Sequence, residues 1–364
     1  MSAAGWSWLL AACALAGLLL PLLPALIELW RRTDAAPLQV VRRQDTNIGH
    51  FAESFRTQIE ALLTQRMLPP GEQVQDVEWK QGEPVRLVGP LARAFIGADE
   101  AAARLVRAVL VLAGDARLPE RIVYEQEVYG LGSIHCGGTA TLRAVYAHGA
   151  LRLEARSVIA RWAHARTRLA TEPGCRLLGR ASAGERILLG ADTEFERLHA
   201  PLIRCGPPPA APPAATGPRS AWAPSRGTAI GPRCLLVDGD CAIPAGVELS
   251  TDLVVRGRLR LGSGTRAAGS LKAHGDVEIG PGSIVLGSVV SQRNVVLGAH
   301  CRIRGPLIAE DTADLGSGCV IGTPGRPTTV SAADVRLAPG TQVSGTLWAH
   351  RSGLTATATP AAAS

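Results

Sequence analysis

Residues 269–287 read GSLKAHGDVEIGPGSIVLG, and small or apolar residues recur in this stretch as pairs separated by one residue. Residues i and i+2 of a β-strand point to the same side, so each pair predicts a short strand with two inward side chains. Glycines lie between the pairs, where a corner needs a positive φ or leaves no room for a side chain. The stretch therefore predicts one coil of three strands, with the inward pairs Leu271/Ala273, Val277/Ile279 and Ser283/Val285.

The pattern repeats every 18 residues through the second half of the chain. Rows that start at Arg233, Thr251, Gly269, Gly287 and Gly305 give thirty inward positions, of which twenty-seven are Ala, Val, Ile, Leu or Cys. A short repeat of this kind overrides local secondary-structure signals, because each coil buries its apolar side chains only against its neighbours. We therefore predict an all-β fold, a triangular β-solenoid whose coils are hydrogen-bonded at roughly 4.8 Å.

The same period occurs earlier in the chain, in rows that start at Arg143, Arg161 and Gly179. The stretch between the two repeats contains eight prolines, which predict a semi-rigid linker that interrupts the solenoid. We therefore expect two solenoid blocks. The expected organisation is a transmembrane anchor at 1–32, a juxtamembrane helix and connecting region at 33–105, a first block at 106–205, a Pro/Ala-rich linker at 206–232, a second block at 233–352 and a disordered tail at 353–364.

The composition of the 364 residues agrees with a turn-rich fold of small side chains. Gly and Pro together contribute 65 residues, whereas Phe, Trp and Tyr contribute only 14. The formal net charge of +7 is spread along the chain without a dense basic run, so we expect no nucleic-acid partner. Eight cysteines without a CxxC pair indicate free thiols in a reducing compartment.

An apolar run near the N-terminus predicts a membrane anchor. Residues 8–27 carry no charge, which is the length that spans a hydrocarbon core of about 30 Å, and Trp6 and Trp30 flank the run. Arginines follow the run and none precedes it, so the positive-inside tendency places the N-terminus outside and the solenoid blocks in the cytoplasm. The sequence thus predicts a single-pass inner-membrane protein that contacts the membrane through residues 6–30.

Residues 47–63 predict an amphipathic helix, because apolar residues recur there at steps of three and four. Two interpretations of its apolar face remain open. The face packs on the domain behind it, or it lies on the inner leaflet or against another copy.

No residue constellation in the sequence predicts catalysis, a cofactor or a metal site. Cys175, Cys301 and Cys319 share one inward column where the neighbouring positions are mostly Ser or Thr, which indicates a small, weakly polar core residue. A disulfide between Cys301 and Cys319 would require oxidising conditions. His148, His274 and His350 share a position close to a corner, where a tolerated turn residue is the simplest interpretation.

Two surfaces are candidates for association. The outward residues Val254, Val290 and Ile308 form a partly apolar column that is interrupted by Lys272. The C-terminal coil around Leu347 and Trp348 is followed by no capping helix, and an uncapped coil exposes unpaired backbone groups. We therefore predict self-association of the chain through Leu347 and Trp348.

The second block, and above all residues 269–287, resembles the bactofilins, the polymer-forming bacterial cytoskeletal proteins, over about a hundred residues; the first block resembles them more loosely. The resemblance implies a right-handed β-helix that associates end to end into filaments at the inner membrane, positioning envelope or polysaccharide-synthesis proteins. The full anchor, the long region before the repeats and the second block are departures from that family. They favour a membrane-attached scaffold over a free filament.

Two other classes of protein remain open. Hexapeptide-repeat acyltransferases also use 18-residue coils, with a His at the subunit joint and a loop that leaves the coil. The insertion within residues 323–344 contains no His, which argues against this class. A secreted adhesin or sugar-binding solenoid would require the apolar run to be a cleaved signal peptide. We expect a structural scaffold and not an enzyme.

Overall fold

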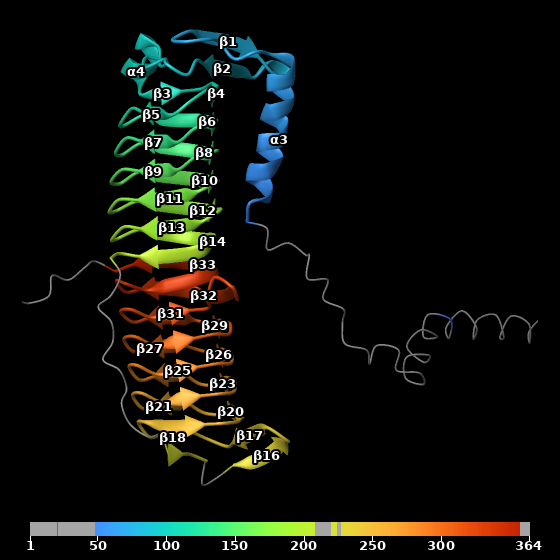
Figure 1. Ribbon diagram of the computed structural model, residues 1–364, viewed down its shortest axis with the longest axis vertical. Coiled ribbons are helices and arrows are strands. Elements are labelled where there is room, and N and C mark those ends of the chain that lie inside the picture. The colour runs from blue at the N-terminus through green and yellow to red at the C-terminus, as the bar shows by residue number, and fades with distance from the viewer. Residues whose placement is uncertain (1–19, 21–47, 208–219, 224–226, 357–364) are drawn as a thin grey trace, which may run out of the picture. The chain divides into compact units, whose positions relative to one another are not determined.

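In the computed structural model, three short strands alternate with tight turns in each coil, and the coils stack along one axis (Figure 1). The chain is an all-β solenoid of about 13 turns with 18-residue coils and few helices, as the repeat predicts. The structure describes residues 20, 48–207, 220–223 and 227–356. Residues 48–364 form one compact unit, which contains the whole solenoid.

A helix, a hairpin and a second helix precede the solenoid. These elements are α3 (His50–Gln65), β1 (Val74–Glu78), the 3-10 helix η3 (Lys80–Gly82), β2 (Pro84–Val88) and α4 (Ala98–Ala103). The hairpin strand β2 pairs in parallel with the first coil strand β4, so the hairpin continues one face of the solenoid. The strands of the first block are β3 (Leu105–Val106), β4 (Val109–Leu112), β5 (Ala116–Leu118), β6 (Val123–Gly130), β7 (Ile134–Cys136), β8 (Thr141–Ala147), β9 (Leu151–Leu153), β10 (Val158–Ala165), β11 (Arg168–Thr171), β12 (Arg176–Ala183), β13 (Arg186–Leu189) and β14 (Glu194–Cys205).

From β17 to β31, the strands of the second block are short and regular. Leu253, Leu271 and Val289 are successive partners in one parallel ladder, each 18 residues from the next. The block comprises β15 (Ser220–Ala221), β16 (Thr228–Gly231), β17 (Cys234–Val237), β18 (Cys241–Ile243), β19 (Val247–Leu249), β20 (Asp252–Val255), β21 (Leu259–Leu261), β22 (Arg266–Ala267), β23 (Leu271–Ala273), β24 (Val277–Ile279), β25 (Ile284–Val285), β26 (Val289–Ser291), β27 (Val295–Leu297), β28 (Arg302–Ile303), β29 (Leu307–Ala309), β30 (Thr312–Leu315), β31 (Val320–Ile321), β32 (Thr328–Leu337) and β33 (Gln342–Thr355).

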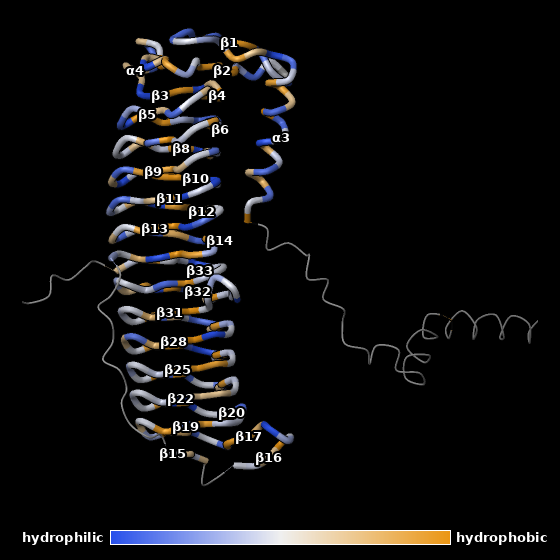
Figure 2. The backbone as a smooth tube through the Cα atoms, viewed as in Figure 1, coloured by the Kyte–Doolittle hydropathy of each residue, from blue (hydrophilic) through white to orange (hydrophobic). Residues whose placement is uncertain are grey.

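The predicted inward positions form the core. Of the thirty positions named for the second block, all but Leu235 are buried, and Leu235 packs against the core. All eighteen inward positions of the three rows in the first block are buried as well. Apolar residues recur in the strands from coil to coil along the solenoid (Figure 2). The inward pairs of the repeat therefore point into the core, as the alternation of side chains along a strand predicts.

Glycine at the corners is required by close approach of the backbone. At Gly287, an added Cβ would lie 2.5 Å from the Ser270 nitrogen of the preceding coil. Stacked corners therefore leave no room for a side chain there, which accounts for the glycines between the inward pairs.

The two blocks join end to end in one solenoid (Figure 1). The last strand of the first block, β14, pairs antiparallel with the last strand of the chain, β33, and Leu198 lies opposite Leu347. All other pairs between successive coils are parallel, so the two blocks run in opposite directions toward their shared joint. Their apolar side chains form one continuous cluster.

Strand pairing extends beyond the predicted boundaries of the second block. β33 continues to Thr355, into the predicted tail 353–364, because residues up to Thr355 pair with β32 along Asp334–Leu337. The strands β15 and β16 lie within the predicted linker 206–232.

Helix α3 packs on the outward side of the first block, next to β8 and β10 (Figure 1). Its apolar residues Phe55, Ile59 and Leu62 are buried, and the Phe55 ring lies 5.5 Å from the Trp162 ring between centroids. Packing on the domain behind the helix is therefore confirmed for the described residues 48–63 of the predicted helix, and the leaflet and second-copy alternatives are set aside.

The predicted localisation requires a correction. Within the described parts of the chain, no helix is long and apolar enough to cross a membrane. The predicted span at residues 8–27 lies outside the described residues except for Leu20. A single-pass inner-membrane protein, with contact through residues 6–30, is thus not supported.

Candidate functional site

The two residues predicted to mediate self-association lie inside the chain's own joint. Leu347 is fully buried between Leu198 of β14 and Val330 of β32, and Trp348 pairs with Arg197. The prediction of a free edge at the C-terminal coil is therefore wrong in its location, because the first block covers that edge. The 18-residue periodicity contains no information about which strand this coil meets.

The predicted apolar column exists as an outward ladder on the second block. Val254, Lys272, Val290 and Ile308 are successive partners in the strands β20, β23, β26 and β29. Ile308 is 41% exposed, whereas Val254 and Val290 are partly buried. The column is one residue wide and interrupted by a lysine, so a role in association stays a prediction.

The cysteine column belongs to the core, as the sequence indicates. Cys175, Cys301 and Cys319 are buried free thiols. The Cys301 thiol donates to the Gly280 carbonyl at 3.3 Å, and the Cys319 thiol donates to the Gly298 carbonyl at 3.1 Å. The neighbouring Cys301 thiol, together with burial, raises the pKa of Cys319. Such thiols are inert packing groups and not nucleophiles.

Thiol reactivity provides a direct check of this assignment. Burial raises the pKa of the Cys136 thiol to about 12, whereas Cys234 lies partly exposed in the first coil of the second block. In the native protein at about pH 8, iodoacetamide is expected to label Cys234 at least about tenfold faster than Cys301, because only the accessible thiolate reacts. Peptide mapping by mass spectrometry measures both rates. The Cys301→Ser variant is the control and should leave the labelling of Cys234 unchanged; labelling of Cys301 at the rate of Cys234 would contradict the buried column.

The three corner histidines are not brought together. His148 is partly buried, and its Nε2 lies 2.6 Å from the Tyr129 hydroxyl, whereas His274 and His350 are exposed. Burial lowers the pKa of His148, so the imidazole is neutral at pH 7. A turn role fits His274. The same prediction is wrong for His350, which lies within β33 with its Nε2 3.0 Å from the Ser331 hydroxyl, and His148 is part of the aromatic cluster under α3.

Sequence reasoning missed a polar ladder on the same face. Tyr146, His164, Ser182 and His199 are outward partners in successive strands. The His164 Nδ1 lies 2.8 Å from the Ser182 hydroxyl, and burial lowers the pKa of His164. The 18-residue spacing of Tyr146, His164 and Ser182 was the available signal. The ladder is covered in part by α3, and no described groove is lined by these residues.

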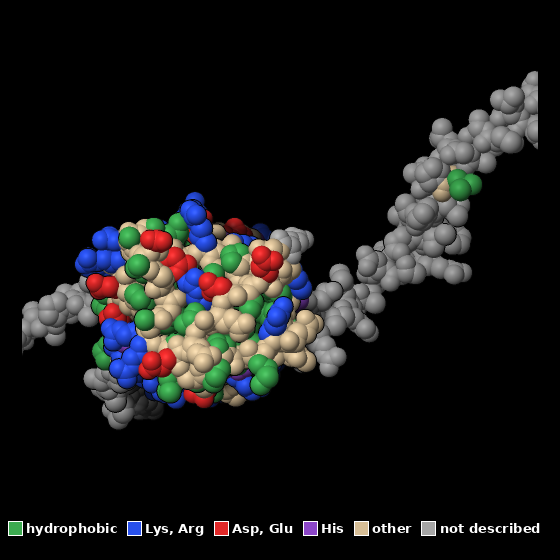
Figure 3. Space-filling view, turned by 90° about the horizontal axis from the view of Figure 1, so that it is seen from above, with side chains coloured by type: hydrophobic (Ala, Val, Ile, Leu, Met, Phe, Trp, Pro, Cys, Tyr) green, Lys and Arg blue, Asp and Glu red, His purple; other side chains and the backbone are tan. Residues whose placement is uncertain are grey.

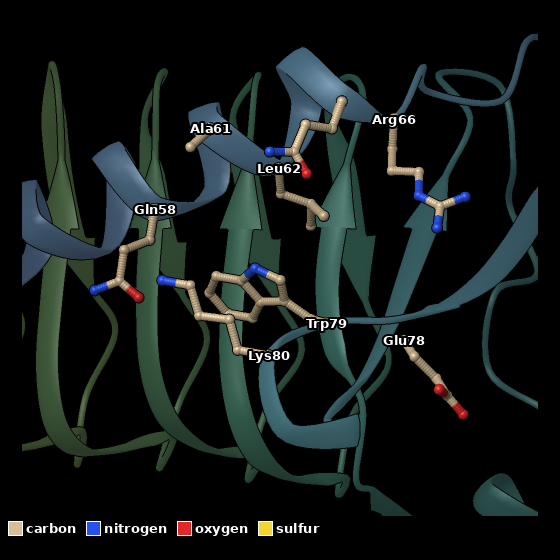
Figure 4. A pocket seen from close by; sticks show the side chains of 8 residues that line it. Gln58, Ala61, Leu62, Arg66, Glu78, Trp79 and Lys80 are labelled. Carbon is tan, nitrogen blue, oxygen red and sulfur yellow. The ribbon is translucent and has the colours of Figure 1, made fainter.

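One surface groove lies between α3 and the β1–β2 hairpin. Its volume is about 300 Å³, and in Figure 4 Leu62 of the helix points toward Trp79 of the hairpin connection. Trp79 packs against the cluster that holds the helix on the first block. We attribute this groove to the docking of the helix.

A second groove lies at the joint of the two blocks. Its volume is about 320 Å³, and it is formed by residues of β12, β14 and β33. The lining comprises Gly179, Arg180, Glu196, Arg197, Trp348, Ala349 and His350. Two arginines and one tryptophan therefore meet where the first and the second block join.

Metal ligands do not cluster within the described ranges: no group of three or more His, Cys, Asp or Glu side chains is placed to hold an ion. The fold and these surfaces define a β-solenoid protein with grooves on its flank and a joint in its middle. Comparison with protein-family models, with curated proteins and with solved structures gave no match.

Proposed function

We propose that the chain is a structural scaffold that self-associates end to end, through the first coil of its second block. The carrying observation is the joint between the two blocks, where the coil ends β14 and β33 pair antiparallel. Two coil ends of this chain therefore pair directly with each other, without another helix or strand between them. The resemblance of the second block to the bactofilins also supports end-to-end self-association.

The free end of the second block offers one edge of the same kind. Among the described residues, β18 pairs with β21 alone. The Cys241 N–H donates to the Arg258 carbonyl, and the Ile243 carbonyl accepts from the Gly262 N–H, both at 2.8 Å. Backbone groups of successive residues alternate in direction, so the N–H and C=O of Ala242 point away from β21. An edge of this kind is a template for another strand.

The other two faces at this end are already covered. β15 pairs with β19, and β16 pairs with β17, so these two short strands cover β19 and β17, whereas no described strand covers β18. A second copy that adds its own β18 in the antiparallel direction would satisfy both edges at once. Such a contact is a closed two-fold interface.

The N-terminal end is less suited to the same contact. The β1–β2 hairpin extends one face there, and Phe95 is buried against the core with Ala92 and Ile96 beside it. Seen from above, charged side chains of both signs lie interspersed with scattered apolar ones on this end (Figure 3). Mixed charge of this kind opposes non-specific stacking. We therefore propose that two solenoids form a dimer through β18, and that this dimer is one long rod.

The edge is tested by removing one N–H. In sedimentation velocity, the full chain is expected to reach twice its mass of 38.0 kDa as concentration rises, whereas Ala242→Pro stays monomeric. Proline has no backbone N–H and cannot pair at an edge. The Ala242→Ser variant keeps the N–H and should still dimerise. A wild-type chain that stays monomeric, or an Ala242→Pro dimer with unchanged affinity, would overturn the proposal.

The hexapeptide-repeat acyltransferases are the rival class, since their coils have the same length. Transfer of an acetyl group from acetyl-CoA to an amine or a hydroxyl acceptor, with release of free CoA thiol, is the discriminating measurement. Turnover by the wild-type chain would replace the scaffold proposal by an enzyme. Positioning of envelope or polysaccharide-synthesis proteins, which the family resemblance implies, stays a prediction.

A further inference from the structure

Outward ladders of this solenoid generally place opposite charges next to one another. Arg176 pairs with Glu194 at 2.6 Å, and Arg260 pairs with Glu278 at 2.9 Å, each across adjacent coils. Opposite charges on directly opposed strand positions stabilise a sheet, and like charges destabilise it. The chain thus uses the stacking of its coils to compensate its many arginines.

The ladder at the joint of the two blocks departs from this rule, as does the pair of Arg168 and Arg186 between β11 and β13. Arg180 of β12 and Arg197 of β14 are direct partners in the parallel register, with Trp162 on one side and Trp348 on the other. Within the described residues, neither guanidinium makes an ion pair or donates a side-chain hydrogen bond. Two adjacent positive charges without a paired acid are an electrostatic cost, and such costs are typical of binding sites.

Aromatic rings hold both guanidinium groups in place. The Arg197 guanidinium carbon lies 3.8 Å from the centroid of the Trp348 ring, and that of Arg180 lies 4.7 Å from the Phe51 ring of α3. Stacking uses the flat face of a guanidinium and leaves its N–H edges free to donate. Burial, and next the charge of Arg180, lower the pKa of Arg197, but arginine remains protonated at pH 7.

The strand pairing is irregular next to both arginines. The pairing of β12 with β14 shifts between Leu177 and Arg180, and the pairing of β14 with β33 shifts between Phe195 and Arg197. Bulges of this kind re-aim the side chains that follow them. Gly179 has a φ of +114°, and an added Cβ would collide with the Arg161 carbonyl. Gly179 thus lines the groove of about 320 Å³ beside the two arginines, at a position where no other residue fits without a shift of the backbone.

We propose that this groove binds a phosphate group, either as inorganic phosphate or as the phosphate monoester of a small metabolite. Phosphate offers three terminal oxygens, which match the N–H edges of two guanidinium groups. Its charge at pH 7 is about −1.5 to −2, which balances two arginines better than one carboxylate does. Glu196 is the acidic member of the lining; it is exposed at the rim and makes no ion pair within the described residues.

The proposal is tested by isothermal titration calorimetry on the full chain at low ionic strength. The probes are inorganic phosphate, glucose 6-phosphate, glucuronate and glucose. Wild-type protein is expected to bind both phosphate probes with a Kd at or below about 1 mM, and glucuronate at least about tenfold more weakly. A tighter Kd for glucose 6-phosphate than for inorganic phosphate identifies an ester as the ligand, and equal affinity identifies free phosphate.

The decisive variant is the double substitution Arg180→Gln with Arg197→Gln, which is expected to weaken phosphate binding at least about tenfold. Arg176→Gln removes a similar charge from the same strand and should change the Kd by less than about twofold. Circular dichroism verifies that each variant keeps its β-structure. Phosphate should raise the melting temperature of the wild type and of Arg176→Gln but not of the double variant, since ligand binding stabilises only a protein that binds. Undetectable binding by the wild type, or unchanged binding by the double variant, would overturn the proposal, as would equal affinity for glucuronate.

Discussion

The Ile279→Asp variant is expected to lose several kcal/mol of stability, because the new carboxylate would be buried without a partner. Ile279 is 3% exposed and lies between Leu261 and Leu297 in one inward ladder. Each coil is stabilised only by its neighbours, so a failure in this coil removes the support of the coils on both sides. Urea unfolding followed by circular dichroism measures the loss, and proteolysis of the native protein should become faster.

Glu278 provides the matched control on the outward side of the same strand. Its carboxylate pairs with Arg260 at 2.9 Å, and the two side chains are 43% and 55% exposed. An exposed ion pair contributes about 0–1 kcal/mol, so Glu278→Gln should cost no more than that. Similar losses in Ile279→Asp and Glu278→Gln would contradict the inward and outward assignment of this coil.

The Leu347→Asp variant is expected to open the joint between the two blocks. Leu347 is fully buried opposite Leu198, in the antiparallel pair of β14 with β33 that unites two apolar cores. A buried carboxylate there would cost several kcal/mol, and the cost falls on the strand pair at the joint of the blocks. Wild-type protein should unfold in one urea transition, whereas the variant should show two transitions and a larger radius of gyration in small-angle X-ray scattering.

Leu354 lies on the same strand and pairs with Glu194 of β14, but it is 45% exposed, so it tests whether the effect requires a buried side chain in the joint. The Leu354→Asp variant should keep one transition and the wild-type radius, because substitutions at exposed positions usually cost less than about 0.5 kcal/mol. If Leu347→Asp unfolds in a single transition at the wild-type urea midpoint, the joint contributes little and the two blocks are independent in solution.

The sequence predicted the coil because the information for a coil is local. Pairs such as Val277/Ile279 follow from the alternation of side chains along a strand, and Gly287 follows from the narrow corner. Both rules act within about 18 residues. The inward column, the position of Cys301 and the outward ladder with Ile308 could therefore be deduced from the amino-acid sequence.

The direction and the partners of the blocks could not be deduced in this way. The sequence analysis recognised the strand edge at Leu347. The strand that pairs with this edge is β14, about 150 residues earlier in the chain. Every strand edge offers the same backbone groups, so the sequence does not identify the partner. For the same reason, the free edge was assigned to the wrong end of the second block. The docking of α3 was one of two open interpretations. Its surface on the first block includes Trp162, the tyrosines Tyr129 and Tyr146, and the valines Val109 and Val111 of β4.

The candidate phosphate groove shows most clearly which features follow from the repeat and which depend on contacts between distant parts of the chain. By itself the sequence determined a solenoid of 18-residue coils, its inward side chains and its corner glycines, because these depend on the period of a strand and on contacts between successive coils. The three-dimensional contacts were needed to show that the blocks meet tail to tail, that Leu347 is part of the core and that Arg197 stacks on Trp348. These contacts join residues far apart in the chain, and their pairing depends on which coil ends meet in space, a choice that a repeating pattern leaves open.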